Sequence, residues 1–365
     1  MSLRLQDVSK ISNGETHIFP TDIELQKGTM NVLLGPTSSG KTSLMRLMAG
    51  LDKPDTGKIY WEEQDVTNQR VQDRDIAMVY QQFVNYPAMT VYENIASPLK
   101  LQKKCAADID AKVREMAELL QLTSILDRKP NEISGGQQQR CAMARALAKD
   151  VGLVLMDEPL ANLDYKLREE LRIEIPRLFE ASGSIFVYAT TEPEEALLLG
   201  GNTATLWEGR VTQVAPAMDV YRNPVDEITA RVYSDPPMNF VSVKKQGAFV
   251  HFPNGQSAKA HDDLASLPDG AYRAGFRAHH IALGDNLAGA ITFDAQLIVT
   301  ELTGSDTFVH LDTMDERWIG LVSGLQAFEV GKMLKVCLSP DNIFYFDKDN
   351  ELVFSPPSEP EMYRA

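Results

Sequence analysis

Cysteine is scarce in this sequence of 365 residues, and long apolar runs are absent from it. The three cysteines, Cys105, Cys141 and Cys337, are scattered and form no C-x-x-C pair. This argues against a zinc site or a disulfide framework and fits a reducing compartment. No apolar run approaches the roughly 18 residues of a membrane-spanning helix, and the N-terminus lacks the apolar core of a signal peptide. We therefore expect any role at a membrane to depend on a partner.

Positive charge is also in deficit, since the formal net charge is −15. An acidic chain argues against a nucleic-acid-binding surface, unless that surface is very local. The hydrophobic content of 44% and the charged content of 24% are ordinary for a globular protein. The length suits about two domains.

One glycine-rich stretch carries the clearest chemical signal. Residues 30–34 form an apolar run that predicts a buried strand, and residues 43–50 predict a helix. Between them lies the pattern G-x-x-x-x-G-K-[ST], which in this strand–loop–helix setting predicts a phosphate-binding P-loop rather than a chance glycine loop. Its residues are Gly35, Pro36, Thr37, Ser38, Ser39, Gly40, Lys41 and Thr42. Backbone N–H groups and the helix N-terminus at Ser43 are expected to bind phosphate, with Lys41 on the β- and γ-phosphates and Thr42 on Mg²⁺.

Two carboxylates follow another apolar run. Residues 153–156 predict a buried strand, which ends at Asp157 and Glu158. Beside a P-loop, Asp157 is expected to hold Mg²⁺ through water and Glu158 to polarise the attacking water. The alternative is a pair of surface carboxylates without a catalytic role.

A second anion site is predicted at the start of another helix. Ser134, Gly135, Gly136 and Gln137 offer a hydroxyl and backbone N–H groups there. Because one triphosphate rarely needs two such sites, we expect this one to serve a nucleotide bound to another chain.

The pattern of elements changes near residue 235. Before it, strands alternate with helices, which implies an α/β fold with a mainly parallel sheet covered by helices. One of the expected helices, residues 164–181, contains Pro176, which should kink or interrupt it. After residue 235, short β-like runs alternate with turns and predict a small all-β barrel.

The motifs together closely resemble the ATP-binding-cassette (ABC) ATPases. The P-loop, Gln81, the segment at 134–138, the Asp157-Glu158 pair and the segment at 160–164 stand in the order of that family. The resemblance implies a P-loop NTPase domain at residues 1–235, with a helical subdomain at about 85–150. It also assigns Gln81 to catalysis and the metal site, and Asp164 to nucleotide binding.

Residues 86–95 and the barrel-like tail are similar to the carbohydrate and polyol importer branch of the family. In that branch, residues 236–365 would form an OB-type regulatory domain. The resemblance implies a head-to-tail dimer, with each ATP between the P-loop of one chain and the Ser134 segment of the other. It further implies two transmembrane permease subunits, a solute-binding protein outside the membrane and a peripheral location on the cytoplasmic face of a bacterial membrane. The segment from Phe83 to Pro87 would receive a permease helix, or would be a loop with core aromatics.

This chain departs from the family pattern at two positions. Thr191 stands where the family usually has a histidine that senses the γ-phosphate, and threonine cannot titrate near neutral pH. Ser12 stands where an aromatic residue usually stacks on adenine, which is expected to lower ATP affinity unless His17 or Phe19 compensates.

Two interpretations of Thr191 remain open from the sequence. In one, this site hydrolyses slowly and the chain pairs with an unlike ATPase subunit; in the other, Glu158 suffices and a homodimer is fully active. The first resembles some glycerol importers, so glycerol is the expected solute, with a sugar or glycerol 3-phosphate as the alternative. A non-transport ABC protein and a regulatory module switched by ATP are more distant alternatives.

Overall fold

The computed structural model describes residues 2–82, 84–161, 163–284, 289–313 and 316–357. The chain divides into two compact units, Met1–Ala217 and Met218–Ala365. The expected functional boundary between residues 235 and 236 stays a prediction. Within the described residues, no helix has both the length and the apolar character needed to cross a membrane.

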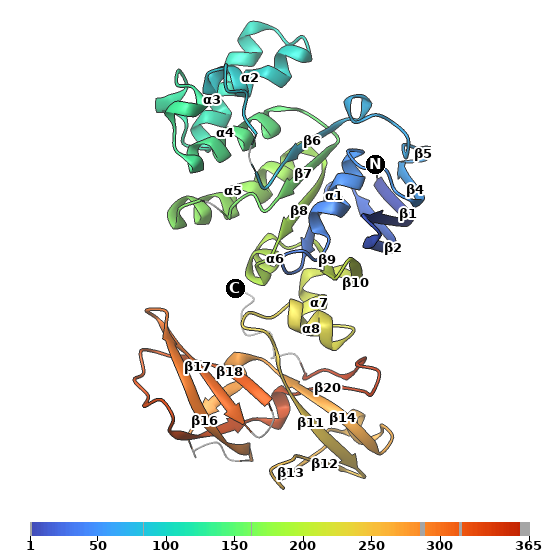
Figure 1. Cartoon of the computed structure of the whole chain (residues 1–365), viewed down its shortest axis with the longest axis vertical. Helices are drawn as coiled ribbons and strands as arrows, with labels where there is room; N and C mark the ends of the chain where they lie inside the picture. Colours follow the sequence, from blue (N-terminus) through green and yellow to red (C-terminus); the bar gives the residue numbers. More distant parts are fainter. Residues whose placement is uncertain (1, 83, 162, 285–288, 314–315, 358–365) are drawn as a thin grey trace. The chain divides into compact units, whose positions relative to one another are not determined.

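The first unit contains two sheets and a group of helices (Figure 1). The antiparallel sheet has the order β2-β1-β4-β5, with β1 (Ser2–Ser12), β2 (Glu15–Gln26), β4 (Thr56–Trp61) and β5 (Gln64–Asp65). The second sheet has the order β10-β9-β3-β8-β7-β6, with β3 (Met30–Leu34), β6 (Ile76–Val79), β7 (Leu153–Asp157), β8 (Ile185–Thr190), β9 (Asn202–Trp207) and β10 (Arg210–Pro216). All its pairings are parallel except β9–β10, which confirms the α/β expectation.

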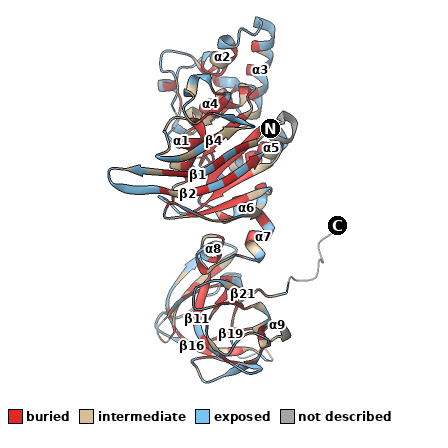
Figure 2. Cartoon of the chain, turned by 90° about the vertical axis from the view of Figure 1, so that its right-hand side faces the viewer, coloured by how far each residue is buried: buried red, intermediate tan, exposed pale blue. Residues whose placement is uncertain are grey.

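Burial explains the two kinds of strand. Every residue of β7 and β8 is buried, as expected for parallel strands covered on both faces. By contrast, β1 and β2 alternate between buried and exposed residues along much of their length (Figure 2). Their inner faces share one apolar core with helix α1 (Lys41–Ala49) and the central strands. This core fixes the P-loop between the two sheets.

The remaining α-helices of this unit are α2 (Val91–Leu101), α3 (Ala106–Leu119), α4 (Gly135–Ala148), α5 (Tyr165–Ser182) and α6 (Pro193–Leu199), while α7 (Ala217–Arg222) crosses the unit boundary. Short 3-10 turns occur at Val71–Asp73, Thr123–Ile125 and Pro130–Glu132. Helices α2, α3 and α4 gather at one end of the unit (Figure 1). The expected interruption at Pro176 is wrong, because α5 continues through it. Leu167, Leu171 and Ile175 are buried along one side of α5, and this packing compensates for the backbone hydrogen bond that proline cannot make.

The second unit is mainly all-β and curled, in agreement with an OB-type domain. Its antiparallel sheets have the orders β13-β12-β11-β14-β20-β21 and β15-β19-β16-β17-β18. The bounds are β11 (Asn239–Gln246), β12 (Phe249–His251), β13 (Ser257–Lys259), β14 (Gly270–Phe276), β15 (Ile281–Leu283), β16 (Ile291–Leu302), β17 (Asp306–Thr313), β18 (Glu316–Ser323), β19 (Met333–Leu338), β20 (Phe344–Phe346) and β21 (Leu352–Phe354). Helices α8 (Glu227–Val232) and α9 (Asp262–Ala265) and 3-10 turns at Ala278–His280 and Pro340–Asn342 complete it. Trp318 anchors the core, with the rings of Phe276 and Phe293 each 4.9 Å from it in edge-to-face contact.

Candidate functional site

The P-loop connects β3 to α1 through two positions, 35 and 40, that favour glycine. Gly40 has a φ of 105° and is the N-cap of α1, without a side-chain cap. A Cβ on Gly35 would lie 2.4 Å from the carbonyl oxygen of Leu206, so only glycine fits there. The first N–H groups of α1 therefore stay available for an anion at the helix N-terminus.

Lys41 lies buried beneath this loop. Its Nζ donates to the carbonyl oxygens of Gly35 at 2.7 Å and Pro36 at 3.0 Å, and it lies 3.5 Å from Oε1 of Glu158. Burial lowers the pKa of Lys41, and the charges of Glu158 and Asp157 partly offset that effect. The ammonium group is thus held at the loop by two backbone carbonyl oxygens, which phosphate oxygens could replace, with Glu158 beside it.

Two further interactions bring the expected catalytic residues together. The hydroxyl of Thr42 donates to Oδ2 of Asp157 at 2.7 Å, and the amide of Gln81 donates to Oε2 of Glu158 at 2.9 Å. Asp157 is 2% exposed. Burial and the neighbouring charge of Glu158 raise the pKa of Asp157, while Thr42 and Lys41 lower it. A hydroxyl and a carboxylate at this place are oxygen ligands of the kind that Mg²⁺ prefers beside phosphates.

Lys41, Thr42, Gln81 and Glu158 line a cavity of about 590 Å³, and buried Asp157 reaches it only through its hydrogen bond with Thr42. One half is formed by the P-loop and the start of α1, with Gln81 and Glu158 beside it. The other half is formed by β2, through Glu15, Thr16 and His17, and by the turn at Glu208 and Gly209 between β9 and β10. The sequence predicted the phosphate side of the cavity and, on the opposite wall, offered only His17 or Phe19 as alternatives, because no motif marks the wall opposite a P-loop.

The Ser134 segment is placed elsewhere. Ser134 caps α4 and accepts from the N–H of Gln137 at 3.3 Å, while Gln137 accepts from the N–H of Ser134 at 2.9 Å. Ser134 and Gly135 are exposed, and Gly136 follows in the first turn of the same helix. None of these four residues lines the cavity described above. The expectation that they serve a nucleotide on another chain stays a prediction.

Asp164 also caps a helix, since its Oδ1 accepts from the N–H of Leu167 at 3.0 Å at the start of α5. Asn162 of the same segment and Phe83 of the expected permease contact lie outside the described residues. Beyond Phe83, Val84, Tyr86 and Met89 are exposed by 59%, 48% and 38%. This apolar exposure is typical of a surface that meets a partner.

Thr191 lies in an exposed bend between β8 and α6 and does not line the cavity. A buried polar network fixes its neighbours. Glu195 accepts from the hydroxyls of Thr190 at 2.6 Å and Tyr188 at 3.1 Å. Arg172 lies 3.4 Å from Oε1 of Glu195 and 2.7 Å from Oε2 of Glu192.

Sequence reasoning missed this network, which Arg168 extends. Its guanidinium lies 3.3 Å from Oε1 of Glu192 and donates to the carbonyl oxygen of Ala161 at 3.3 Å. The spacing of Arg168 and Arg172, four residues apart on one helix, was the only available signal.

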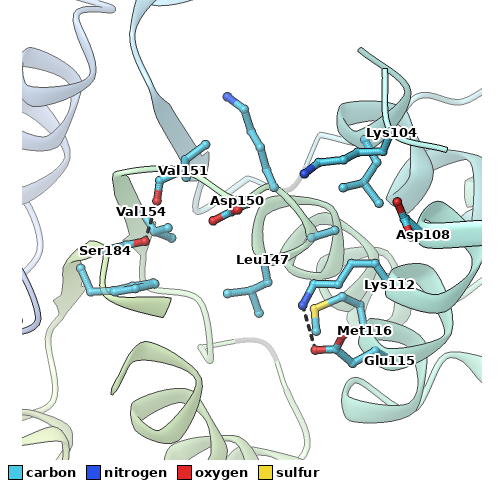
Figure 3. A pocket seen from close by; sticks show the side chains of 14 residues that line it. Lys104, Asp108, Lys112, Glu115, Met116, Leu147, Asp150, Val151, Val154 and Ser184 are labelled. Atoms are coloured by element: carbon cyan, nitrogen blue, oxygen red, sulfur yellow. Dashed lines mark hydrogen bonds and ion pairs between the residues drawn. The ribbon is translucent and has the colours of Figure 1, made fainter. Parts of the chain in front are cut away.

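A second cavity, of about 420 Å³, lies where α3 approaches the end of α4 and the start of β7 (Figure 3). Its lining includes Lys104 and Lys112 but also Asp108 and Glu115, and Lys112 pairs with Glu115 at 2.8 Å. With acidic and basic groups in balance, it does not resemble a phosphate site.

The fold and the site define a P-loop ATPase with a second, all-β domain. Residues 19–161 match the ABC transporter family. The chain is 36% identical over 368 residues to the trehalose/maltose import ATP-binding protein MalK of Thermococcus litoralis, covering 95% of this chain and 97% of that protein. It is 34% identical over 362 residues to the sn-glycerol-3-phosphate import ATP-binding protein UgpC of Cupriavidus pinatubonensis, covering 94% and 97%.

A solved dimer of an ATP-binding cassette, in a post-hydrolysis state bound to ADP and Pi, is similar in fold. The TM-score is 0.54 at 27% identity, covering 59% of this chain and 98% of that one. This chain therefore belongs to the ATP-binding proteins of ABC transporters, which are ATPases coupled to transport.

Proposed function

We propose that this chain is the ATP-hydrolysing subunit of an importer for a carbohydrate or polyol, working at the cytoplasmic face of a bacterial membrane. The observation that carries the proposal is the convergence of Lys41, Thr42, Gln81 and Glu158 on one cavity at a P-loop, with Asp157 hydrogen-bonded to Thr42 behind it. Full-length relatives named for trehalose/maltose and glycerol 3-phosphate import support the transport role.

In the proposed mechanism, Lys41 exchanges its carbonyl partners for phosphate oxygens. Thr42 and Asp157 would hold Mg²⁺, which would supply positive charge beside the phosphates. Glu158 would accept the proton of the attacking water, and Gln81 would orient that carboxylate through the hydrogen bond between them.

The proposed assembly contains a second ATPase subunit, two permease subunits and an external solute-binding protein. Ser134, Gly135, Gly136, Gln137 and Asp164 are proposed to complete the nucleotide site of the partner ATPase. The exposed apolar residues beyond Phe83 would contact a permease. The names of the relatives favour a sugar or glycerol 3-phosphate as solute, whereas glycerol stays our own prediction from the Thr191 departure.

We further propose that the site on this chain is the slower half of an asymmetric pair. The support is chemical: Thr191 offers a hydroxyl where an imidazole is usual, and a hydroxyl does not titrate near neutral pH. The competing proposal, a fully active homodimer that depends on Glu158 alone, gives the opposite kinetic result.

The test is the steady-state ATPase rate of the purified full-length chain at saturating MgATP. Replacing Thr191 by His should raise turnover by roughly tenfold or more, without loss of stability because Thr191 is exposed. Glu194→His places the same ring at an exposed position in α6 and should change nothing. Glu158→Gln should abolish turnover in both backgrounds. A fast natural chain that Thr191→His leaves unchanged would show that Thr191 does not limit hydrolysis and would contradict the asymmetric pair.

A further inference from the structure

The wall of the nucleotide cavity formed by β2 and the β9–β10 turn has its own chemistry. It is lined by two carboxylate residues, Glu15 and Glu208, together with Thr16, His17 and Gly209. Carboxylates repel phosphate groups, so we expect a bound triphosphate to stay at the P-loop, beside Lys41, and its base to lie against this wall. We propose that the imidazole ring of His17 is the surface on which the base of ATP stacks. This inference rests on the proposed function, since it requires ATP in the cavity.

A β-bulge places His17 against the P-loop. On β1, Lys10 pairs with Ile18 and the next residue, Ile11, pairs with Thr16. His17 is thus the extra residue on β2, without a partner across the ladder. Bulges of this kind turn a side chain out of the regular alternation and are common beside active sites. A Cβ on Gly209 would lie 2.6 Å from the carbonyl oxygen of His17, and one on Gly40 would lie 3.3 Å from it. The bulged residue is therefore in close contact with the loops that bound the cavity.

The other candidate aromatic residue, Phe19, is already covered. The guanidinium of Arg210 lies 3.5 Å from the centre of the Phe19 ring. The backbone N–H of Phe19 donates to the carbonyl oxygen of Gly209 at 2.9 Å. Phe19 does not line the cavity. Among the cavity-lining residues in the described part of the chain, His17 alone carries an aromatic ring. Ser12, at the end of β1, has no ring to offer.

The experiment is isothermal titration calorimetry of the full-length chain with MgATP and with magnesium tripolyphosphate, which has the phosphates but no base. Loss of base stacking in His17→Ala should weaken ATP binding by roughly 5- to 150-fold. The affinity of His17→Ala for tripolyphosphate should stay within about twofold of that of the natural chain, a difference below about 0.5 kcal/mol in binding free energy. His17→Phe should retain ATP affinity, because a phenyl ring can stack in the same place. Phe19→Leu is the matched control in the same strand and should change ATP affinity by less than about threefold.

Each other outcome overturns the inference. Unchanged ATP affinity in His17→Ala would exclude stacking on this ring. An equal loss of ATP and tripolyphosphate affinity would show that His17 supports the phosphate loop instead. Both results leave the proposed function intact, provided that the natural chain binds ATP. A natural chain that binds tripolyphosphate but shows no preference for ATP would also exclude a base site here, whereas failure to bind either would contradict the proposed function itself.

Discussion

Replacing Arg172 by Leu should strongly destabilise the first unit, because it isolates a buried carboxylate. The Arg172 side chain is 12% exposed and its partner Glu195 is 6% exposed. The guanidinium also contacts Glu169 at 2.6 Å and Glu192 at 2.7 Å. Leucine would leave Glu195 without its counterion, while the other two carboxylates are about 40% exposed and can be hydrated.

The expected cost follows from what Glu195 retains. Removal of one partner of a buried ion pair costs about 3–5 kcal/mol. Glu195 keeps two hydroxyl donors, from Tyr188 and Thr190, so we expect a loss near the lower limit, about 3 kcal/mol. This is a large fraction of the 5–15 kcal/mol that is typical of a domain. Because Thr190 precedes Thr191, the same change should also release the bend that carries Thr191.

The assay is urea unfolding followed by tryptophan fluorescence in a Trp318→Phe background. Of the three tryptophans, Trp61 and Trp207 then remain, and both lie in the first unit. The matched control is Arg177→Leu on the same helix, where the arginine is 69% exposed and pairs with Glu174 at 2.8 Å. It should cost less than about 0.5 kcal/mol.

A second variant separates charge from packing. Adding Glu195→Gln to Arg172→Leu removes the buried charge but keeps an oxygen for the two hydroxyls, so it should restore at least about 1 kcal/mol. A cost below about 1 kcal/mol for Arg172→Leu, or no recovery in the double variant, would refute the argument that an unpaired buried charge determines the effect.

Three further predictions concern the nucleotide site. Lys41→Ala should weaken MgATP binding in calorimetry by roughly 100-fold or more, since charge-assisted hydrogen bonds are lost. Arg46→Ala is the control, because Arg46 lies on the same helix but is half-buried, pairs with Asp52 and does not line the cavity. It should not weaken binding, and equal effects of the two changes would contradict the role of Lys41. Asp157→Asn should raise the free energy of unfolding without Mg²⁺ by about 0.5–2 kcal/mol at neutral pH, because the pKa of the folded carboxyl is raised. In the natural chain, the cost of burying the ionised Asp157 carboxylate disappears as the pH falls from the raised pKa of the folded state to the lower pKa of the unfolded state. The difference in free energy of unfolding between the two proteins should therefore shrink in urea titrations at lower pH. A difference that stays constant with pH would contradict the raised pKa of Asp157. Ser134→Arg should leave ATP binding unchanged but prevent ATP-dependent dimerisation, measured by light scattering. The control Ser134→Ala removes only the helix cap and should cost about 1 kcal/mol of helix stability. Dimerisation of the Ser134→Arg variant would exclude the proposed role of Ser134 in the site of a partner chain.

Much of the fold follows from local sequence. A short, fully apolar run such as 153–156 favours a strand covered on both faces, and the P-loop pattern requires a strand before it and a helix after it. The N-caps of two helices, at Ser134 and Asp164, are equally local. Each side chain accepts a hydrogen bond from the backbone N–H three residues further along the chain. Pro176 shows the limit of local rules, because tertiary packing kept the helix intact.

The sequence by itself determined the phosphate half of the cavity, the ATPase family resemblance and the all-β character of the second unit, since these depend on motifs and periodicity within short segments. The sequence offered His17 and Phe19 as alternatives for the opposite wall, and only the tertiary structure decided that His17 lines it together with Glu15, Thr16, Glu208 and Gly209. His17 and Gly209 are 192 residues apart (209 − 17) and meet because β2 packs beside the β9–β10 turn. The same holds for the network of Arg172, Glu192 and Glu195, which depends on how α5 and α6 pack. Contacts of this kind depend on chain topology, which no single segment encodes.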